Sequence, residues 1–450
     1  MGKSLYSPRV LIVAENASTR FGGEAALPLH YYRELRQLGV PVWLLVHART
    51  RAELSHDFPG DDHIHFVEDS RVHQRLWRLG AKLPHLVAYM TTDYVSRVVT
   101  QRSQRRMARR LVQSEGIEVV HQPIPVSPRE PSLLHDIGAP VIIGPMNGGM
   151  RFPPAFSRQR GWMERWLYAI GAPGARLLNL VMPGKRKADL LLVANERTRR
   201  ALPGSAGVRV ETLVENGVDL ALWTTTPPQG KGRVDPSNAT TFMFMGRLID
   251  LKAVDLLLVA FRKASTHAPM ALLIVGDGDE RARLEAQARE AGILASTAHA
   301  ESRLPDQGTV RFTGWLSQRE CAQWLREADV LVMPSLRECG GAAVLEAMAM
   351  AKPVIATAWG GPADYIDSQC GILVPPESPE AVVEGFAQAM VRLASSKEDA
   401  RRLGEAGRDK VVSAYSWRTK AEAMLEIYRR VAAEASVRRA RGTGRSAESS

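Results

Sequence analysis

The stretch that decides the fold runs from Ala328 to Ile366 and reads ADVLVMPSLRECGGAAVLEAMAMAKPVIATAWGGPADYI. Its first part, VLVMP, is a short apolar run typical of a buried parallel strand. SLRECGG then predicts a turn, to which Gly340 and Gly341 give backbone freedom, and AAVLEAMAMA is a series of strong helix formers. Strand, turn and helix in this order predict one unit of a parallel α/β sheet.

Two glutamates lie in this unit, Glu338 in the turn and Glu346 in the first turns of the predicted helix. The free N–H groups at a helix N-terminus carry partial positive charge and suit the oxygens of a diphosphate. Carboxylates accept strong hydrogen bonds from the hydroxyl groups of a polyol. In this setting the pattern favours a ligand that combines phosphate and sugar over a surface pair of glutamates on an alanine-rich helix.

The same alternation of apolar runs and amphipathic stretches extends across most of the chain in two series. The first begins with RVLIVAEN, a helical LPLHYYRELRQLG and VPVWLLVHA, and the second begins near residue 240 with TTFMFMGR. Residues 224–240 are rich in Thr, Pro, Gly and Lys and have no apolar period, so they predict a loop at or near a linker. The whole pattern predicts two Rossmann-like, doubly wound α/β domains, with ligands bound in a cleft at the carboxyl ends of both sheets.

Composition agrees with a globular chain of two domains. The 450 residues are enough for two separate cores. No apolar run approaches the roughly 18–20 residues that span a bilayer, and MGKSLYSPRVLIVAEN lacks the apolar core and cleavage site of a signal peptide. Cys321, Cys339 and Cys370 are widely spaced and indicate neither a disulfide framework nor a zinc site, so we expect a cytoplasmic protein.

The net charge of +11 is unusual and is partly concentrated in clusters. Residues 97–110 carry six arginines and no acidic residue, which indicates a solvated helix face or an anionic partner: nucleic acid, an anionic membrane or a phosphate-bearing substrate. RGWMERW at residues 160–166 precedes the apolar LLNLVMP and the basic GKRK at residues 184–187. This arrangement suits the surface of an anionic membrane as well as a helix packed on its own domain.

Further segments follow one another as FGGEAALPLHYYRELRQLG, VVHQP, LVENGVDLALW, FMGRLIDLKAVDLLLVAF, LLIVGDGDER, VRFTGWL and YSWRTKAEAMLEIYRRV. In this order, and with the Glu-x7-Glu stretch, they resemble glycosyltransferase family 4, the retaining enzymes of the GT-B fold. The resemblance covers nearly the whole chain. It implies an N-terminal, acceptor-side domain over residues 1–205 and a C-terminal donor domain over residues 206–412. Residues 413–432 would form a helix that returns to the N-terminal domain, before a disordered tail at 433–450.

The resemblance implies a role for each matching residue. Arg247 and Lys252 would clamp the donor diphosphate and neutralise charge on the leaving group. His121 and Glu338 would lie beside the transferred sugar, and Glu346 would hold the ribose hydroxyls. The implied catalytic residues are Glu338, His121, Arg247 and Lys252, and the implied donor-binding residues are Gly22, Gly23, Arg247, Lys252, Gly314, Trp315, Glu338, Gly340, Gly341 and Glu346.

The function that the resemblance implies is a hexosyltransferase-type, retaining transfer from a nucleoside diphosphate sugar to an acceptor hydroxyl. The acceptor would attack on the face from which the nucleoside diphosphate departs, and positioning and electrostatic stabilisation would provide catalysis. If the basic, tryptophan-bearing stretch at residues 160–187 binds a membrane, we expect a lipid-linked saccharide acceptor at its inner face, in polysaccharide or glycolipid assembly. We expect no cofactor and no metal ion.

The chain departs from the family pattern in places. Cys339-Gly340 replaces the usual Gly-Phe after the first glutamate, and Ala253 replaces a glycine after the lysine. The segment from Gly144 to Phe156, GPMNGGMRFPPAF, matches no general motif of the family; it is a plain turn or a contact of the donor or acceptor.

Other readings of the motifs are weaker. Asp277-Gly-Asp279 would suit a divalent cation, but Arg247 and Lys252 already supply positive charge. The glycines of LLIVGDGDER lack the third glycine of a nicotinamide-binding loop. A nucleic-acid-binding protein is less favoured because the arginine-rich stretch has no interleaved aromatic residues. A sugar-nucleotide 2-epimerase shares the GT-B architecture and stays an alternative.

Overall fold

The computed structural model describes residues 6–84, 87–88, 91–157, 173–204, 207–226, 239–295 and 305–447. The chain forms two compact units. The first comprises Met1–Gly149, Met163–Glu215 and Trp417–Ser450, and the second comprises Met150–Trp162 and Asn216–Ser416. No described helix combines the length and the apolar character that a membrane crossing requires.

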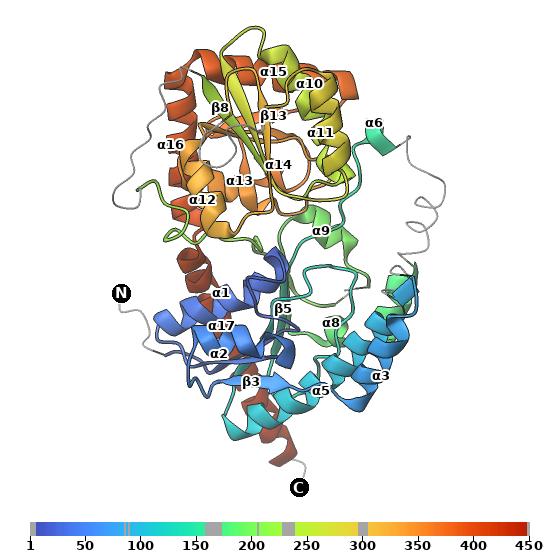
Figure 1. Cartoon of the computed structure of the whole chain (residues 1–450). Helices are drawn as coiled ribbons and strands as arrows, with labels where there is room; N and C mark the ends of the chain where they lie inside the picture. Colours follow the sequence, from blue (N-terminus) through green and yellow to red (C-terminus); the bar gives the residue numbers. More distant parts are fainter. Residues whose placement is uncertain are drawn as a thin grey trace. The chain divides into compact units, whose positions relative to one another are not determined.

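The first unit is built on a seven-stranded parallel sheet with the order β3-β2-β1-β4-β5-β6-β7 (Figure 1). Its strands are β1 (Val10–Val13), β2 (Val42–His47), β3 (Ile64–Val67), β4 (Val119–Gln122), β5 (Val141–Met146), β6 (Leu190–Val193) and β7 (Val210–Thr212). Its helices are α1 (Gly23–Gln37), η1 (Ala48–Thr50), α2 (Arg51–Asp57), α3 (Arg71–Gly80), α5 (Thr92–Ser114), α8 (Gly184–Lys187), α9 (Glu196–Ala201) and α17 (Trp417–Ala447), and residues 173–181 are also helical.

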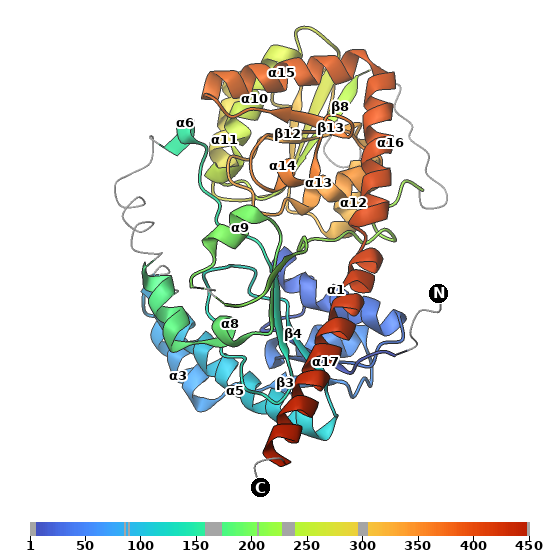
Figure 2. The same ribbon diagram turned by 180° about the vertical axis from the view of Figure 1, so that it is seen from behind.

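Apolar layers cover both faces of this sheet. Val10 and Ile12 of β1 pack in one layer with α1 and α17, whereas Leu11 and Val13 pack in the other with α5. Successive side chains of a strand point to opposite faces, so a strand buried on both faces has to be apolar throughout. Figure 2 shows α17 running along the face that also carries α1.

The second unit contains a six-stranded parallel sheet with the order β10-β9-β8-β11-β12-β13. Its strands are β8 (Thr240–Met245), β9 (Met270–Val275), β10 (Val310–Gly314), β11 (Val330–Met333), β12 (Val354–Thr357) and β13 (Gly371–Val374). Its helices are α6 (Pro154–Ser157), η2 (Asp250–Lys252), α10 (Val254–Ala264), α11 (Arg281–Glu290), α12 (Gln318–Glu327), α13 (Ala342–Ala349), α14 (Gly361–Tyr365), α15 (Pro379–Ser395) and α16 (Lys397–Ala414).

The two parallel sheets confirm the predicted pair of doubly wound α/β domains. The unit boundary falls between Glu215 and Asn216, where the sequence predicts 205 and 206, and residues from Met150 onward join the second unit. The chain re-enters the first unit at Trp417. Helix α17 continues to Ala447, into the stretch for which the sequence predicts a disordered tail. Most of the predicted linker at 224–240 lies outside the described residues.

Candidate functional site

The site residues of the second unit lie in loops at the carboxyl edge of its sheet. The order of the strands reverses between β8 and β11, and open α/β sheets bind ligands at such a switch point. The loop after β8 carries Arg247 and Lys252, and the loop after β11 carries Glu338. Leu336 donates its backbone N–H to the carbonyl of Leu251 at 3.0 Å, which ties the two loops together.

Lys252 and Glu338 form an ion pair between these loops. Their side chains are only 15% and 17% exposed, so each charge depends largely on the other for compensation. The structure therefore brings together two of the predicted catalytic residues. A ligand with a phosphate and a hydroxyl group could break this ion pair, because the phosphate would bind Lys252 and the hydroxyl would donate to Glu338.

Arg247 follows β8 directly and is exposed. It pairs with no acidic side chain of the described residues, in contrast to Lys252. A guanidinium group in this position offers a planar fork of donors to an anion. Its predicted contact with a diphosphate stays a prediction.

The glycines of LLIVGDGDER have a structural explanation. A Cβ atom on Gly276 would lie 1.9 Å from the carbonyl oxygen of Gly246, and one on Gly278 would lie 2.3 Å from that of Leu248. The loops after β8 and β9 thus pack backbone against backbone, and only glycine allows that distance. The spacing of these glycines serves packing within the unit.

Asp277 is engaged locally. Its carboxylate accepts a hydrogen bond from the N–H of Gly278 at 2.8 Å and pairs with Arg281 at 3.0 Å. These contacts hold the pKa of Asp277 below its usual value, with the Gly278 hydrogen bond as the largest cause. Across the described part of the chain, no cluster of His, Cys, Asp and Glu is arranged to hold a metal ion. Metal independence itself stays a prediction.

A second pair of glycines, Gly360 and Gly361, packs against the turn that carries Glu338. This contact was not predicted from the sequence. Gly361 donates its N–H to the carbonyl of Glu338 at 2.8 Å. A Cβ on Gly360 would lie 2.3 Å from that same oxygen, and one on Gly361 would lie 2.4 Å from the carbonyl oxygen of Cys339. The signal was present in the sequence, since WGGP follows the strand PVIAT much as ECGG follows VLVMP.

The segment from Gly144 to Phe156, which the sequence left open, contributes to both units. Asn147 is buried and donates to Glu215 at 2.8 Å, so the Asn-Gly-Gly turn is packed inside the first unit. Beyond it, the carbonyl of Arg151 accepts a hydrogen bond from the indole of Trp359 at 2.8 Å. The guanidinium of Arg337 lies 5.7 Å from the ring centre of Phe152. Residues 151–152 therefore buttress the loop of Glu338 and its neighbour.

Helix α13 begins after Gly341, which has a φ of 68° and offers no side-chain cap. The N–H of Val344 donates to the carbonyl of Gly341 at 2.9 Å, so the N–H groups of Ala342 and Ala343 are the ones available to an anion. Glu346 lies in this helix and is partly exposed. Loss of hydration around its carboxyl group raises the pKa of Glu346 to about 8, so the group is largely protonated at neutral pH.

Gly314 and Trp315 follow at the end of β10. Gly314 has a φ of 81°, and a Cβ there would lie 2.8 Å from the guanidinium of Arg281. Trp315 is 76% exposed, so its indole is accessible to a ligand. Their predicted contact with a nucleotide base stays a prediction.

Gly22, Gly23 and His121 belong to the first unit. Neither glycine has an atom within 4 Å of an added Cβ; Gly22 is restricted only by its φ of 92°. His121 is completely buried, with Nε2 2.6 Å from the carbonyl oxygen of Gly144 and Nδ1 2.7 Å from the hydroxyl of Tyr428. Burial lowers the pKa of His121 to about 4. This geometry favours an anchor for α17 over the predicted contact with a donor sugar, because both ring nitrogens are already used.

Comparison with known proteins places this geometry in context. Residues 239–396 match the family model described as glycosyl transferases group 1. The glycogen synthase of Mycobacterium tuberculosis (strain ATCC 25618 / H37Rv) is 28% identical over 281 residues, which cover 61% of this chain and 58% of that protein. The chain thus spans little more than half the length of this curated relative.

Solved structures resemble the whole chain. A glycosyltransferase from Rickettsia africae superposes with a TM-score of 0.61 and 15% identity, over 95% of this chain and 99% of that one. HepE of Anabaena in complex with UDP gives a TM-score of 0.57 and 14% identity, over 93% of this chain and 99% of that one. The chain accordingly has the two-domain GT-B fold, and its second unit carries the match to group 1 glycosyl transferases.

Proposed function

We propose that this protein transfers a sugar from a nucleoside diphosphate sugar to an acceptor hydroxyl with retention of configuration. The observation that carries the proposal is the Lys252–Glu338 ion pair beside the exposed Arg247, at the switch point of the second sheet. Two cations and a carboxylate in one place suit a ligand with a diphosphate and a sugar. The match to group 1 glycosyl transferases and the likeness to a UDP-bound structure support the same conclusion.

Each residue then has a role. Arg247, Lys252 and the N-terminus of α13 bind the diphosphate and stabilise the charge that develops as it leaves. Glu338 accepts hydrogen bonds from the hydroxyls of the transferred sugar, and Glu346 holds the ribose. Gly340 and Gly341 give the loop its close approach to the donor, and Gly314 with Trp315 lines the base pocket.

The reaction needs no protein nucleophile. The bond between the anomeric carbon and the phosphate oxygen breaks, and the acceptor oxygen bonds to that carbon on the same face. The acceptor proton passes to the departing phosphate oxygen, so the products are the glycoside and the nucleoside diphosphate. Positioning of the two substrates and stabilisation of the leaving group supply the rate enhancement. The reaction needs no metal ion in this scheme, because Arg247 and Lys252 neutralise the diphosphate.

The proposed setting is the inner face of a membrane, in the assembly of a polysaccharide or glycolipid from hexose units. The charge and the tryptophan-rich, basic stretches of the chain support this setting.

A thermal-shift screen against nucleoside diphosphate sugars tests the function, because a donor that binds only the native state raises the unfolding temperature. We expect one donor to stabilise the protein in the presence of EDTA, and Lys252→Ala to abolish that shift. Release of nucleoside diphosphate only on addition of an acceptor distinguishes transfer from 2-epimerisation. Absence of a shift with every donor, or equal shifts in Lys252→Ala, refutes the proposal.

A further inference from the structure

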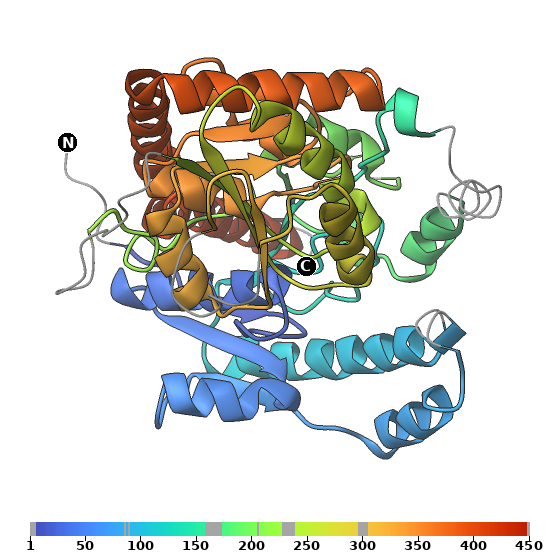
Figure 3. The same ribbon diagram turned by 45° about the horizontal axis from the view of Figure 1, so that its top comes forward.

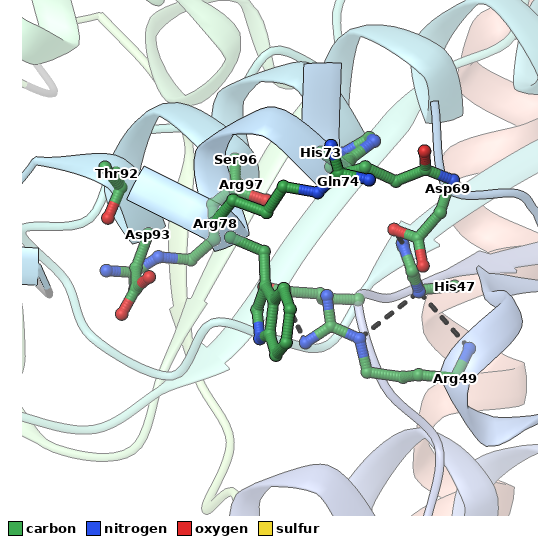
Figure 4. Close-up of a pocket in the computed structure, with 12 residues that line it drawn as sticks. His47, Arg49, Asp69, His73, Gln74, Arg78, Thr92, Asp93, Ser96 and Arg97 are labelled. Atoms are coloured by element: carbon green, nitrogen blue, oxygen red, sulfur yellow. Dashed lines mark hydrogen bonds and ion pairs between the residues drawn. The ribbon is translucent and has the colours of Figure 1, made fainter. Parts of the chain in front are cut away.

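A pocket of about 770 Å³ lies in the first unit, at the carboxyl ends of β1, β2 and β3 and against α3 and α5 (Figure 4). Its lining residues are Glu15, His47, Arg49, Asp69, His73, Gln74, Trp77, Arg78, Thr92, Asp93, Ser96 and Arg97. None of them belongs to the predicted donor site. Figure 4 shows His47, Arg49 and Asp69 gathered on one side of the pocket and Thr92 and Asp93 on the other. The lining of this pocket therefore shares no residue with the predicted donor site.

His47 is a buried donor without a hydrogen-bond partner in this pocket. Its Nδ1 accepts two hydrogen bonds from Arg49, one from the backbone N–H and one from Nε–H, each at 3.2 Å. The proton of the neutral ring is consequently on Nε2. That nitrogen is completely buried and makes no hydrogen bond, and its nearest carboxylate oxygen, on Asp69, is 3.4 Å away. Because this nitrogen has no accessible surface of its own, a ligand oxygen reaches it only when a neighbouring lining side chain moves.

The remaining lining groups are balanced in charge. The lining contains three arginines, Arg49, Arg78 and Arg97, and three acidic residues, Glu15, Asp69 and Asp93. A bare anion would select for an excess of cations, whereas hydroxyl groups both donate and accept hydrogen bonds and suit a mixed lining. Trp77 adds an indole that is 75% exposed, a flat apolar surface for a sugar ring. The chemistry of the pocket fits a saccharide.

An apolar surface borders the pocket. Trp77 belongs to a group that includes most of the exposed large apolar side chains among the described residues, which we call the docking face. The docking face consists of Val72, Trp77, Leu79, Leu83, Val87, Val95, Leu177, Leu178, Leu180 and Val181. So many exposed apolar side chains in one part of a protein mark a contact with a membrane or another protein.

These residues come from two segments that are distant in the sequence and adjacent in the fold. Figures 1 and 2 show helix 173–181 near α3 and the start of α5, and Figure 3 shows the start of α5 nearer to it than α3. The hydroxyl of Tyr94 donates to the sulfur of Met182 at 3.8 Å, which connects the end of helix 173–181 to α5. Trp77 and Arg78 line the pocket from α3, the same helix that exposes Val72 and Leu79.

The docking face is basic as well as apolar. Residues 70–92 and 173–188 contain no Asp or Glu. Arg71, Arg75, Lys82 and Arg176 are exposed among the apolar side chains and pair with no acidic residue of the described chain. Apolar side chains with unneutralised cations complement the surface of an anionic bilayer. A protein partner would need a matching acidic and apolar patch, whereas any anionic membrane supplies both features.

The contribution of GKRK at residues 184–187 is smaller than its sequence indicates. Lys185 is buried and donates to the carbonyl oxygens of Ser127 and Pro128 at 2.9 and 3.0 Å, and burial lowers its pKa to about 7. Lys187 pairs with Asp136. The stretch at residues 160–166 lies outside the described residues.

We propose that the docking face binds an anionic bilayer, and that the pocket beside it receives the saccharide head of a lipid-linked acceptor embedded in that bilayer. The acceptor lipid stays in the membrane while its sugar reaches the pocket past Trp77. This inference rests on the proposed function and names the class of acceptor.

Vesicle flotation tests the docking face with the full chain. Wild type floats with vesicles of phosphatidylethanolamine and phosphatidylglycerol (7:3) at low salt, and flotation falls at high salt and with pure phosphatidylcholine. Arg71→Ser and Arg75→Ser each weaken binding about fivefold, because a basic residue near an anionic surface contributes about 1 kcal/mol. Leu180→Ser/Val181→Ser also weakens it. The matched control is Val259→Ser/Val412→Ser, two exposed valines of the second unit, which floats like wild type. Equal flotation of all variants overturns the docking face.

Sugar incorporation tests the pocket. Labelled sugar from the donor is followed into the solvent-extractable lipid of membranes from the source cells. Asp69→Asn and Arg78→Gln reduce incorporation at least tenfold while the thermal shift with donor is kept, and Asp62→Asn, a highly exposed residue outside the pocket, changes neither. Unchanged incorporation in both pocket variants overturns the head-group site.

The two proposals fail in different ways. If the proposed function is wrong, wild type shows no thermal shift with any nucleoside diphosphate sugar, but flotation is unaffected. If only the acceptor class is wrong, the donor shift and its loss in Lys252→Ala persist, while label is absent from the lipid extract or flotation is insensitive to the docking-face variants.

Discussion

Substitution of Gly360 by alanine tests whether the close backbone contact between Gly360 and Glu338 determines the geometry of the donor site. Gly360 has a φ of 74°, and an added Cβ would lie 2.3 Å from the carbonyl oxygen of Glu338 and 2.6 Å from Cε of Met150. The methionine side chain can move aside, but the carbonyl belongs to the backbone of the site loop. The loop of Glu338 has to shift by more than a few tenths of an ångström to accept the new atom.

Gly292 provides a matched control in the same unit. Its φ is 71°, and nothing lies within 4 Å of an added Cβ. Gly292→Ala therefore costs only the left-handed conformation, about 1–2 kcal/mol. Gly360→Ala adds the overlap, for which overpacked sites give about 1–3 kcal/mol. With about 2–4 °C lost per kcal/mol in a unit of this size, the control loses about 2–8 °C and Gly360→Ala clearly more.

The assay compares both variants in thermal unfolding and in the thermal shift produced by the donor. We expect Gly292→Ala to keep the wild-type donor shift, because the site is untouched. Gly360→Ala should lose most of that shift, since Glu338 and its partner Lys252 are displaced relative to each other. If the two variants unfold at the same temperature and respond equally to the donor, the loop does not depend on this contact and the reasoning is wrong.

Glu338→Ala should lower sugar transfer severely without unfolding the protein, measured by product formation and by the unfolding temperature; near-normal turnover contradicts the central role of this residue. Arg247→Met should weaken donor binding at least tenfold in a titration and leave stability unchanged, because the exposed side chain has no acidic partner among the described residues; a large loss of stability would indicate a structural role. Burial raises the pKa of Glu346 from its ordinary value of 4.5 to about 8 in the folded state. Between these two values the native state keeps the carboxyl proton and the unfolded state has lost it. The contribution of Glu346 to the free energy of unfolding therefore falls as the pH rises from about 5 to 8. Glu346→Gln should remove that decline in denaturant unfolding measured at several pH values, and parallel pH curves for the variant and wild type would contradict the raised pKa.

The α/β architecture was accessible from sequence because its signals are local. A strand buried on both faces needs a continuous apolar run, and VLVMP, LLIV and VIAT show that property without reference to the rest of the chain. The placement of Glu338 before a helix and Glu346 within it follows from glycines and helix formers a few residues away.

His121 illustrates the limit of such reasoning. The resemblance, through the motif VVHQP, implied that it lies beside the transferred sugar. The hydroxyl of Tyr428, 307 residues later in the chain, and the carbonyl of Gly144 occupy both ring nitrogens instead. No local pattern around VVHQP contains that information, because the partner on α17 is brought there by the return of the chain to the first unit.

By itself, the sequence determined the two series of alternating strands and helices and the position of each candidate residue within its own strand, turn or helix, because hydrophobic period and backbone preference act over a few residues. Only the tertiary structure decided which of these residues meet. The Lys252–Glu338 pair joins positions 86 residues apart, and the pocket of the first unit collects the ends of three strands and the sides of two helices. Such meetings depend on the order of strands in the sheet, which long-range packing sets and which leaves no periodic trace in the chain.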